Sequence, residues 1–288
     1  IPDPVQPTFL KQITDDDGFV TVNKKPRKAK NDYRIYTISL NKDLPQYKSY
    51  NLPTYNKNVM NKHVCVTYGK DYTGDINNWD NVDYIKTLAK NLFFLITADG
   101  GFDEGTDFNN KEQLHYCLIL SEIYTGLALQ AHDGHFVLKV FDVFTETSVH
   151  LLYLLTLCYK GVFIYKPKTS RPTNSEKYII CKNFHLNEES KNVILSVLRN
   201  VQHKLKKQKS RYTSFTIFKS IPQEFIDKVC HMNKSLLANQ CDFLQKAIEL
   251  CNQPDFIQNY DFNLQDSLEQ RKSVFHEWGK HYNLNSYV

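Results

Sequence analysis

This chain of 288 residues lacks the features that mark several classes of protein. It has no run of eighteen apolar residues, and its richest apolar stretch, Val149 to Tyr159, is too short to span a bilayer. It begins at Ile1 without a charged segment followed by an apolar core, so we expect no secretory signal peptide. Its seven cysteines have no Cys-x-x-Cys spacing, which argues against a disulfide framework or a zinc site. We therefore expect an intracellular protein with reduced thiols in its core, no metal and no membrane partner.

Composition allows one substantial core, or a core with an appendage, because 41% of the residues are hydrophobic. The formal charge is +5, and the basic excess lies mainly in the ranges Lys24 to Lys30 and Lys204 to Arg211. A solvated loop or helix end explains such a run as well as an RNA backbone contact does. Lys204, Lys206 and Lys207 are the residues of the second run that we assign to RNA.

The apolar patterns predict an α/β fold. Strand patterns occur at residues 33–40, 63–68, 92–98, 136–140, 162–165 and 178–182, and helical patterns occur at 82–90, 111–131 and 148–159. Gly134 is expected to end the second crossover, and residues 1–31 show little periodicity. Strands and helices alternate until the last two strands, which only a loop joins, so we expect a mostly parallel sheet finished by an antiparallel hairpin. We divide the chain into an α/β domain at 1–185 and a helical extension at 186–288.

Three strand-like blocks each carry one ionisable residue at or near an end. Asp99 lies in the block Phe93 to Phe102, Lys139 in FVLKVFD, and Glu176 in KPKTSRPTNSEKY. Active sites of open α/β sheets lie outside the carboxyl ends of the strands, so these three side chains can converge. The alternatives are a turn-capping aspartate, a lysine that snorkels from an edge strand and a surface glutamate.

Together, TADGGF after LFFLI, the lysine inside FVLKVF and the acid of SRPTNSEKY resemble the FtsJ-like RNA ribose 2′-O-methyltransferases, most closely those acting on the mRNA cap. The resemblance implies a Rossmann-like methyltransferase fold and methyl transfer from S-adenosylmethionine to a ribose 2′-hydroxyl of capped mRNA. It implies three members of a Lys-Asp-Lys-Glu tetrad. Lys139 would accept or steer the hydroxyl proton, Asp99 would hold the ammonium, and Glu176 would orient the sugar or a second lysine.

The resemblance also implies binding roles and partners. Asp75, in the segment Tyr68 to Ile76, corresponds to the residue that recognises adenine, although a plain turn residue is the alternative. Asp99 would also contact the cofactor, and Arg171 would contact RNA. Capped mRNA is the expected partner, together with other capping or transcription subunits, and the nucleus or a viral replication site is the expected location.

The chain departs from the family before residue 69. Gly18 is the only glycine before Gly69, so the Gly-rich loop that passes close to the methionine part of the donor has no counterpart. The first lysine of the tetrad has none either. Two interpretations stay open: an active enzyme whose first strand lies outside this numbering, or a degenerate fold that binds RNA or capping proteins. A third hypothesis is a helical interaction module at 186–288.

Overall fold

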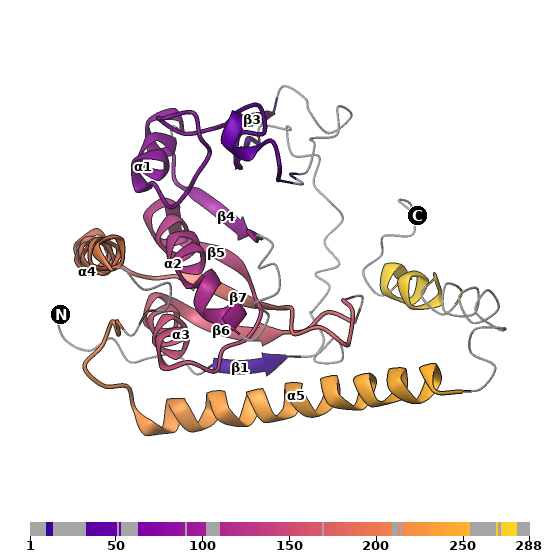
Figure 1. The fold of residues 1–288 in the computed structure, drawn as a ribbon. Helices are drawn as coiled ribbons and strands as arrows, with labels where there is room; N and C mark the ends of the chain where they lie inside the picture. Colours follow the sequence, from indigo (N-terminus) through magenta and orange to yellow (C-terminus); the bar gives the residue numbers. More distant parts are fainter. Residues whose placement is uncertain are drawn as a thin grey trace.

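A five-stranded sheet forms the centre of the molecule (Figure 1). The computed structural model describes residues 10–13, 33–50, 52, 63–89, 91–101, 110–168, 170–208, 213, 215–253, 269 and 272–280. The strands of this sheet are β1 (Leu10–Ile13), β4 (Phe93–Ala98), β5 (Gln130–Val140), β6 (Tyr159–Tyr165) and β7 (Lys177–Phe184), in the order β1-β6-β7-β5-β4. Strands β4 and β5 are parallel, as are β1 and β6, whereas β7 runs antiparallel between β5 and β6. The predicted mostly parallel sheet with a final antiparallel hairpin is confirmed.

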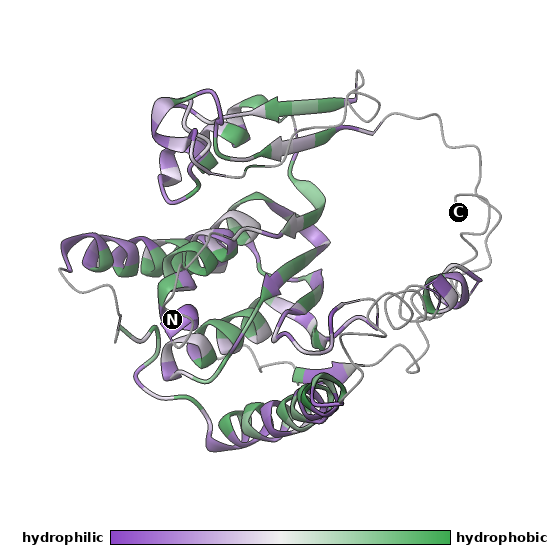
Figure 2. Cartoon of the chain, turned by 45° about the vertical axis from the view of Figure 1, so that its right-hand side comes forward, coloured by the Kyte–Doolittle hydropathy of each residue, from purple (hydrophilic) through white to green (hydrophobic). Residues whose placement is uncertain are grey.

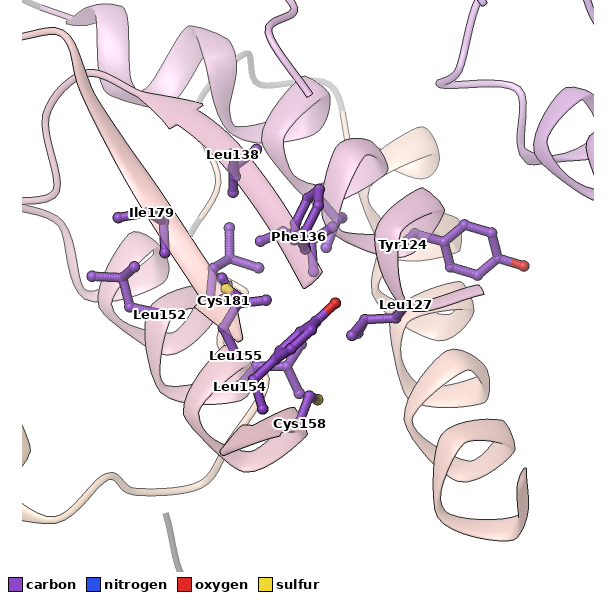
Figure 3. Close-up of a cluster of buried hydrophobic side chains, with 14 of the residues drawn as sticks. Tyr124, Leu127, Phe136, Leu138, Leu152, Leu154, Leu155, Cys158, Ile179 and Cys181 are labelled. Carbon is purple, nitrogen blue, oxygen red and sulfur yellow. The ribbon is translucent and has the colours of Figure 1, made fainter. Parts of the chain in front are cut away.

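Two helices cover one face of this sheet and create the core. The helices α2 (Lys111–Leu129) and α3 (Glu146–Cys158) contact each other, and between them they contact β4, β5 and β6. Side chains of a strand alternate between its faces, so Phe136, Leu138 and Val140 of β5 are buried on the same side. Figure 3 shows Phe136 and Leu138 in a cluster with leucines of α2 and α3. The other face of β5 carries the half-buried residues Val137 and Lys139.

A second, smaller sheet lies apart from the central one. The strands β2 (Ile35–Ile38) and β3 (Val64–Thr67) pair in parallel with each other, and Figure 1 shows β3 in the upper part of the molecule, where α1 (Trp79–Leu88) also lies. A short 3₁₀ helix, η2 (Pro45–Tyr47), lies between them in sequence. Helix α1 begins where the side chain of Asn78 accepts a hydrogen bond from Asp80 N. Trp79 stacks on Tyr124 of α2, which joins this part of the chain to the main core.

The C-terminal helices pack outside the first helical layer. Helix α4 (Glu188–Lys207) contacts α2, and the long helix α5 (Gln223–Cys251) contacts β1 and α3. Residues of both helices belong to the one hydrophobic core, namely Leu195, Leu198, Val201, Phe225, Val229 and Met232. The second half of α5 leaves this core and carries alternating hydrophobic and hydrophilic bands along the lower edge of the molecule (Figure 2). A further helical stretch covers residues 272–280. None of the helices in the described ranges is long and apolar enough to cross a membrane.

Three expectations about the fold are wrong. Residues 1–31 gave no strand signal, yet Leu10–Ile13 forms β1 at the edge of the sheet beside β6. Gly134 does not end a crossover but lies inside β5, which begins at Gln130. The cysteines are free, but only Cys158 and Cys181 are buried, whereas Cys65 is half-buried and Cys117, Cys230, Cys241 and Cys251 are exposed. The prediction of thiols scattered through a core therefore fails for most of them.

Candidate active site

Asp99 and Lys139 lie side by side at the carboxyl ends of two parallel strands. Strand β4 ends at Ala98, which pairs with Leu138 of β5, so the next residue of each strand reaches the same level. The Lys139 ammonium forms an ion pair with the Asp99 carboxylate and donates a hydrogen bond to Asp99 O at 3.0 Å. The lysine side chain is only 15% exposed and that of the aspartate 72%, so the pair opens to solvent on its carboxylate side.

The pair lies on the face of the sheet that α2 and α3 leave uncovered. Leu138 and Val140, the neighbours of Lys139 along β5, point into the core beneath the helices, so Lys139 points the other way. Tyr178 of β7 is the antiparallel partner of Lys139 and therefore shares its face. Three adjacent strands thus bring an acid, a lysine and a phenol to one edge of one face.

Glu176 joins this group through Tyr178. Its carboxylate accepts hydrogen bonds from Tyr178 Oη at 3.2 Å and from Ser170 Oγ at 3.4 Å. Burial, together with the negative charges of Glu176 and Asp99, raises the pKa of Tyr178 to about 12. The phenol therefore stays protonated at neutral pH and can donate its hydrogen bond to Glu176. The sequence reasoning missed Tyr178, whose only signal is its place two residues after Glu176 on the same side of a strand.

A half-buried lysine shapes the loop that carries Glu176. Lys166 follows β6, and its ammonium donates hydrogen bonds to Arg171 O and Asn174 O, both at 3.0 Å, and to Ser170 Oγ at 3.1 Å. Burial lowers the pKa of Lys166, while the charge of Glu176 opposes that shift and the charge of Arg171 adds to it. Lys166 was not among the predicted residues. It fixes the loop from inside, so the exposed side chain of Arg171 projects from an ordered turn.

Helix α2 supports the turn after β4 from the buried side. Glu122 is 3% exposed, and its Oε1 accepts a hydrogen bond from Gly100 N at 2.7 Å. A Cβ atom at Gly100 would lie 2.6 Å from that same oxygen, so a larger residue would displace the Glu122 carboxylate or the turn. A Cβ atom at Gly101, in contrast, would lie 3.8 Å from Lys139 Nζ. The turn is therefore held between the Glu122 carboxylate on its buried side and Lys139 beside it. Glu122 is a second residue that the sequence reasoning missed.

A groove of about 610 Å³ adjoins the loop that holds Glu176. One wall is the segment after β6 and the other is α5, whose Gln240 donates a hydrogen bond to Thr173 O at 3.0 Å. Lys177 of β7 reaches this groove; burial lowers its pKa to about 8, and Asp142 at 4.0 Å opposes that shift. The lining combines polar and apolar side chains, among them Phe144, Pro172, Asn174, Asn233 and Leu237.

Asp75 lies in a tightly bonded loop that follows β3. Its Oδ1 accepts a hydrogen bond from Asn77 N at 2.8 Å, and Asn77 Oδ1 accepts one from Ser121 Oγ on α2 at 3.0 Å. Gly74 has a φ of +73°, and a Cβ atom there would collide with Ser39 O at 1.8 Å, so this turn requires glycine. The structure places Asp75 beyond the carboxyl end of β3, as expected. One of its oxygens already serves the turn, and none of the described contacts joins it directly to Asp99, Lys139 or Glu176.

The basic residues assigned to RNA fall at two places. Arg171 is exposed on the loop after β6. Lys204, Lys206 and Lys207 lie in the last turn of α4, and the chain beyond them returns to the start of α2, where Gln113 accepts a hydrogen bond from Thr213 N at 3.1 Å. The run from Lys24 to Lys30 lies outside the described residues, as do Lys209, Arg211 and Phe102. RNA contact by any of these residues stays a prediction.

Comparison with known proteins identifies the family. The family model of the FtsJ-like methyltransferases matches residues 27–184, which is more than half of the chain. The chain belongs to the FtsJ-like methyltransferase family. The α/β fold, with its mostly parallel sheet and closing antiparallel hairpin, is accordingly the Rossmann-like methyltransferase fold that the sequence motifs imply. The division of the chain after residue 185 stays a prediction.

Curated relatives carry names of cap methyltransferases. The chain is 35% identical over 191 residues to cap-specific mRNA (nucleoside-2'-O-)-methyltransferase 1 of Caenorhabditis elegans, covering 62% of this chain and 21% of the relative. It is 31% identical over 224 residues to the Homo sapiens protein of the same name, covering 73% of this chain and 25% of the relative. A Caenorhabditis briggsae relative that is named inactive, 1B, is 30% identical over 191 residues, with coverage of 62% and 22%. The chain thus spans only a fifth to a quarter of the length of these relatives.

Proposed function

We propose that this chain belongs to an enzyme that methylates a ribose 2′-hydroxyl of capped mRNA. The observation that carries the proposal is the ion pair of Asp99 and Lys139 on the face of the sheet that α2 and α3 leave uncovered, beside Tyr178, the cross-strand partner of Lys139, which donates a hydrogen bond to Glu176. Family membership supplies the methyltransferase chemistry, and the names of the relatives supply the cap and the 2′-oxygen.

Lys139 has the position that this chemistry needs. A ribose hydroxyl is a weak nucleophile at neutral pH, so a side chain must accept its proton as the oxygen attacks. Lys139 Nζ accepts or steers that proton, and Asp99 holds the ammonium group in place. Glu176 and Tyr178 form the adjoining polar wall and orient the sugar. Because Lys139 and Tyr178 are held by strand pairing and the two acids lie next to strand ends, much of the rate enhancement comes from alignment.

FtsJ-like methyltransferases use S-adenosylmethionine as a class, and we assign it to this chain as well. When bound, it supplies the electrophilic methyl group. Asp99 and Asp75 would hold it, since both follow the carboxyl ends of parallel strands, where such folds bind ligands. Asp75 retains one carboxylate oxygen that its turn does not use, and this oxygen suits an adenine amino group. The methionine end has less support, because the sequence before Gly69 has no Gly-rich loop.

Capped mRNA is the proposed partner, and other capping or transcription subunits are proposed with it. The groove beside the Glu176 loop supports an RNA chain, because it has apolar surface for bases and polar groups for their edges. Arg171 at the rim of this loop, and Lys204, Lys206 and Lys207 at the end of α4, would contact phosphates.

Substitution of Lys139 tests the proposal. Methyl transfer from labelled S-adenosylmethionine to capped RNA is measured for the parent chain, for Lys139→Ala and for Lys160→Ala as the control. Lys160 also pairs with an aspartate, Asp133, at 3.0 Å, but both side chains are exposed at the surface. We expect Lys139→Ala to abolish transfer while RNA affinity and melting temperature stay nearly unchanged, and Lys160→Ala to retain transfer. Transfer that survives in Lys139→Ala would remove the catalytic role.

A second candidate function is RNA or protein binding without catalysis. Two observations favour it: the Gly-rich loop has no counterpart in the sequence, and one relative at 30% identity is named inactive. The same experiment separates the two candidates. A parent chain that binds capped RNA but transfers no methyl group at any donor concentration supports the binding module.

A further inference from the structure

We propose that Glu122 is a positioning residue for this reaction. By accepting the hydrogen bond from Gly100 N, it fixes the turn that places Asp99 beside Lys139. The inference rests on the proposed function, since it assigns Glu122 to the same site. Glu122 lies on α2, behind the turn, so it acts through Asp99 and has no contact with the reacting atoms.

The burial of the Glu122 carboxyl group lowers the stability of the fold, which a residue with a purely structural role would not need to do. Its side chain is buried in the hydrophobic helix α2, and its Oε2 has no hydrogen-bond partner among the residues that the structure describes. A buried polar atom without a partner destabilises a fold, and an apolar side chain of similar size would avoid that penalty. The one hydrogen bond that the Glu122 side chain makes to the part of the chain that the structure describes goes to the turn after β4. A role in holding that turn explains why a carboxylate occupies this position.

The fit between Gly100 and Glu122 supports the same role from the other side. A Cβ atom at residue 100 would lie 2.6 Å from Glu122 Oε1 and 3.2 Å from Leu118 Cδ2. A Cβ atom at this position would therefore displace these side chains or the turn itself. Asp99 precedes this contact directly, so a displacement of Gly100 moves the carboxylate that holds the Lys139 ammonium.

The residue before Glu122 on α2 holds the other predicted ligand loop. Ser121 Oγ donates to Asn77 Oδ1 at 3.0 Å and accepts from Trp79 Nε1 at 3.0 Å, and Asn77 N bonds Asp75. One turn of one helix therefore anchors both the Asp75 loop and the Asp99 turn. This arrangement gives the two loops a common rigid support, as an active site requires.

The electrostatics of Glu122 fit a group that faces the pair. Burial raises the pKa of Glu122 to about 7, whereas the Gly100 hydrogen bond and the Lys139 charge oppose that shift, and the Asp99 charge adds to it. The charged groups that act on Glu122 are therefore the two members of the ion pair. A protonated carboxyl group still accepts from Gly100 N through its carbonyl oxygen, so the support does not require the charge.

The test compares substitutions that keep or remove the acceptor. Glu122→Gln retains a carbonyl oxygen for Gly100 N, Glu122→Leu removes it, and Gly100→Ala breaks the same contact from the turn. We measure kcat and the KM for capped RNA, the melting temperature, and the hydrogen exchange rate of the Gly100 amide by NMR. The exchange rate reports on the turn whether or not the chain transfers methyl groups.

We expect Glu122→Leu and Gly100→Ala to lower kcat by about 10- to 100-fold, because a displacement of about 1 Å near a reacting centre has effects of that size. The KM for RNA should change by less than about twofold, as expected when an interaction acts only in the transition state. Glu122→Gln should retain kcat within about threefold. The double variant of residues 100 and 122 should be no slower than the slower single variant, because both changes break one contact. Exchange of the Gly100 amide should accelerate in Glu122→Leu and not in Glu122→Gln.

Each outcome decides the matter. A folded Glu122→Leu with unchanged kcat and an equally protected Gly100 amide would overturn the inference, as would equal losses in the Gln and Leu variants. If Glu122→Leu does not fold, Gly100→Ala and Glu122→Gln provide the same comparison. If the parent transfers no methyl group but the Gly100 amide exchanges faster in Glu122→Leu and not in Glu122→Gln, the proposed function fails. The inference that Glu122 holds the turn after β4 then stands.

Discussion

Glu122 makes the stability of the fold depend on pH in a way that Glu122→Gln should remove. In the folded chain, burial raises the pKa of Glu122 from 4.5 to about 7. The folded state therefore keeps a proton that the unfolded state releases between these values. The contribution of this proton to stability is complete below pH 4.5 and is lost as the pH rises through 7. Glutamine does not titrate, so the variant lacks this loss.

The size of the effect follows from the same two values. A difference between 4.5 and about 7, at 1.36 kcal/mol for each tenfold change in proton affinity, amounts to about 3 kcal/mol. About 2.5 kcal/mol of this falls between pH 5 and pH 8, because at pH 5 the unfolded carboxyl is already mostly ionised. The unfolding free energy of the variant, minus that of the parent, should therefore rise by about 2.5 kcal/mol over this range.

Urea denaturation followed by circular dichroism measures this difference at pH 5, 6, 7 and 8. Taking the difference at each pH cancels the titration of the groups that parent and variant share. A difference that stays flat across the range would show that the folded carboxyl is as solvated as an ordinary glutamate. A difference that falls as pH rises would show that the Lys139 charge outweighs burial at this site.

Two further predictions concern the donor loop and the edge of the core. Asp75→Ala should weaken S-adenosylmethionine binding by roughly 1–3 kcal/mol in a calorimetric titration, the usual cost of losing a hydrogen-bond partner. Tight binding that this substitution leaves unchanged would show that the donor pocket lies elsewhere. Glu112 accepts hydrogen bonds from Phe144 N and from Thr145 N and Oγ1, at 2.7 to 3.1 Å. Glu112→Ala should therefore lower the unfolding free energy by about 2–4 kcal/mol in urea denaturation, Glu112→Gln should lower it less, and equal losses would contradict this account.

The sheet could be predicted from sequence where the local pattern is strong. The blocks that contain Asp99 and Lys139 are long apolar runs, and parallel pairing of such strands brings their ends to one edge whatever the exact register. Their convergence therefore follows from the order of elements along the chain. The side of the sheet follows as well, since Lys139 stands between Leu138 and Val140, which the core must bury.

The elements that sequence reasoning missed depend on tertiary contacts. Strand β1 has only four residues, Leu10–Ile13, too few for a period to be recognised, and its pairing with β6 defines it. Strands β2 and β3 were recognised, but no local pattern indicates that they pair with each other rather than with β4. Glu122 was hidden for a similar reason, since a single acid in a helix says nothing about the face on which it lies. A lone carboxylate within LILSEIYTGLAL was the available signal.

The two faces of β5 connect the core to the proposed chemistry. Leu138 lies among side chains of α2 and α3 (Figure 3), and Val140 is buried in the same core. The residue between them is Lys139. The backbone at Lys139 cannot move unless this packing moves, because protein interiors tolerate little displacement. Glu122 extends the same support to Asp99 by holding Gly100 from α2. Both members of the ion pair are therefore positioned by one helical layer, on the face of the sheet opposite to the one where the substrate would bind.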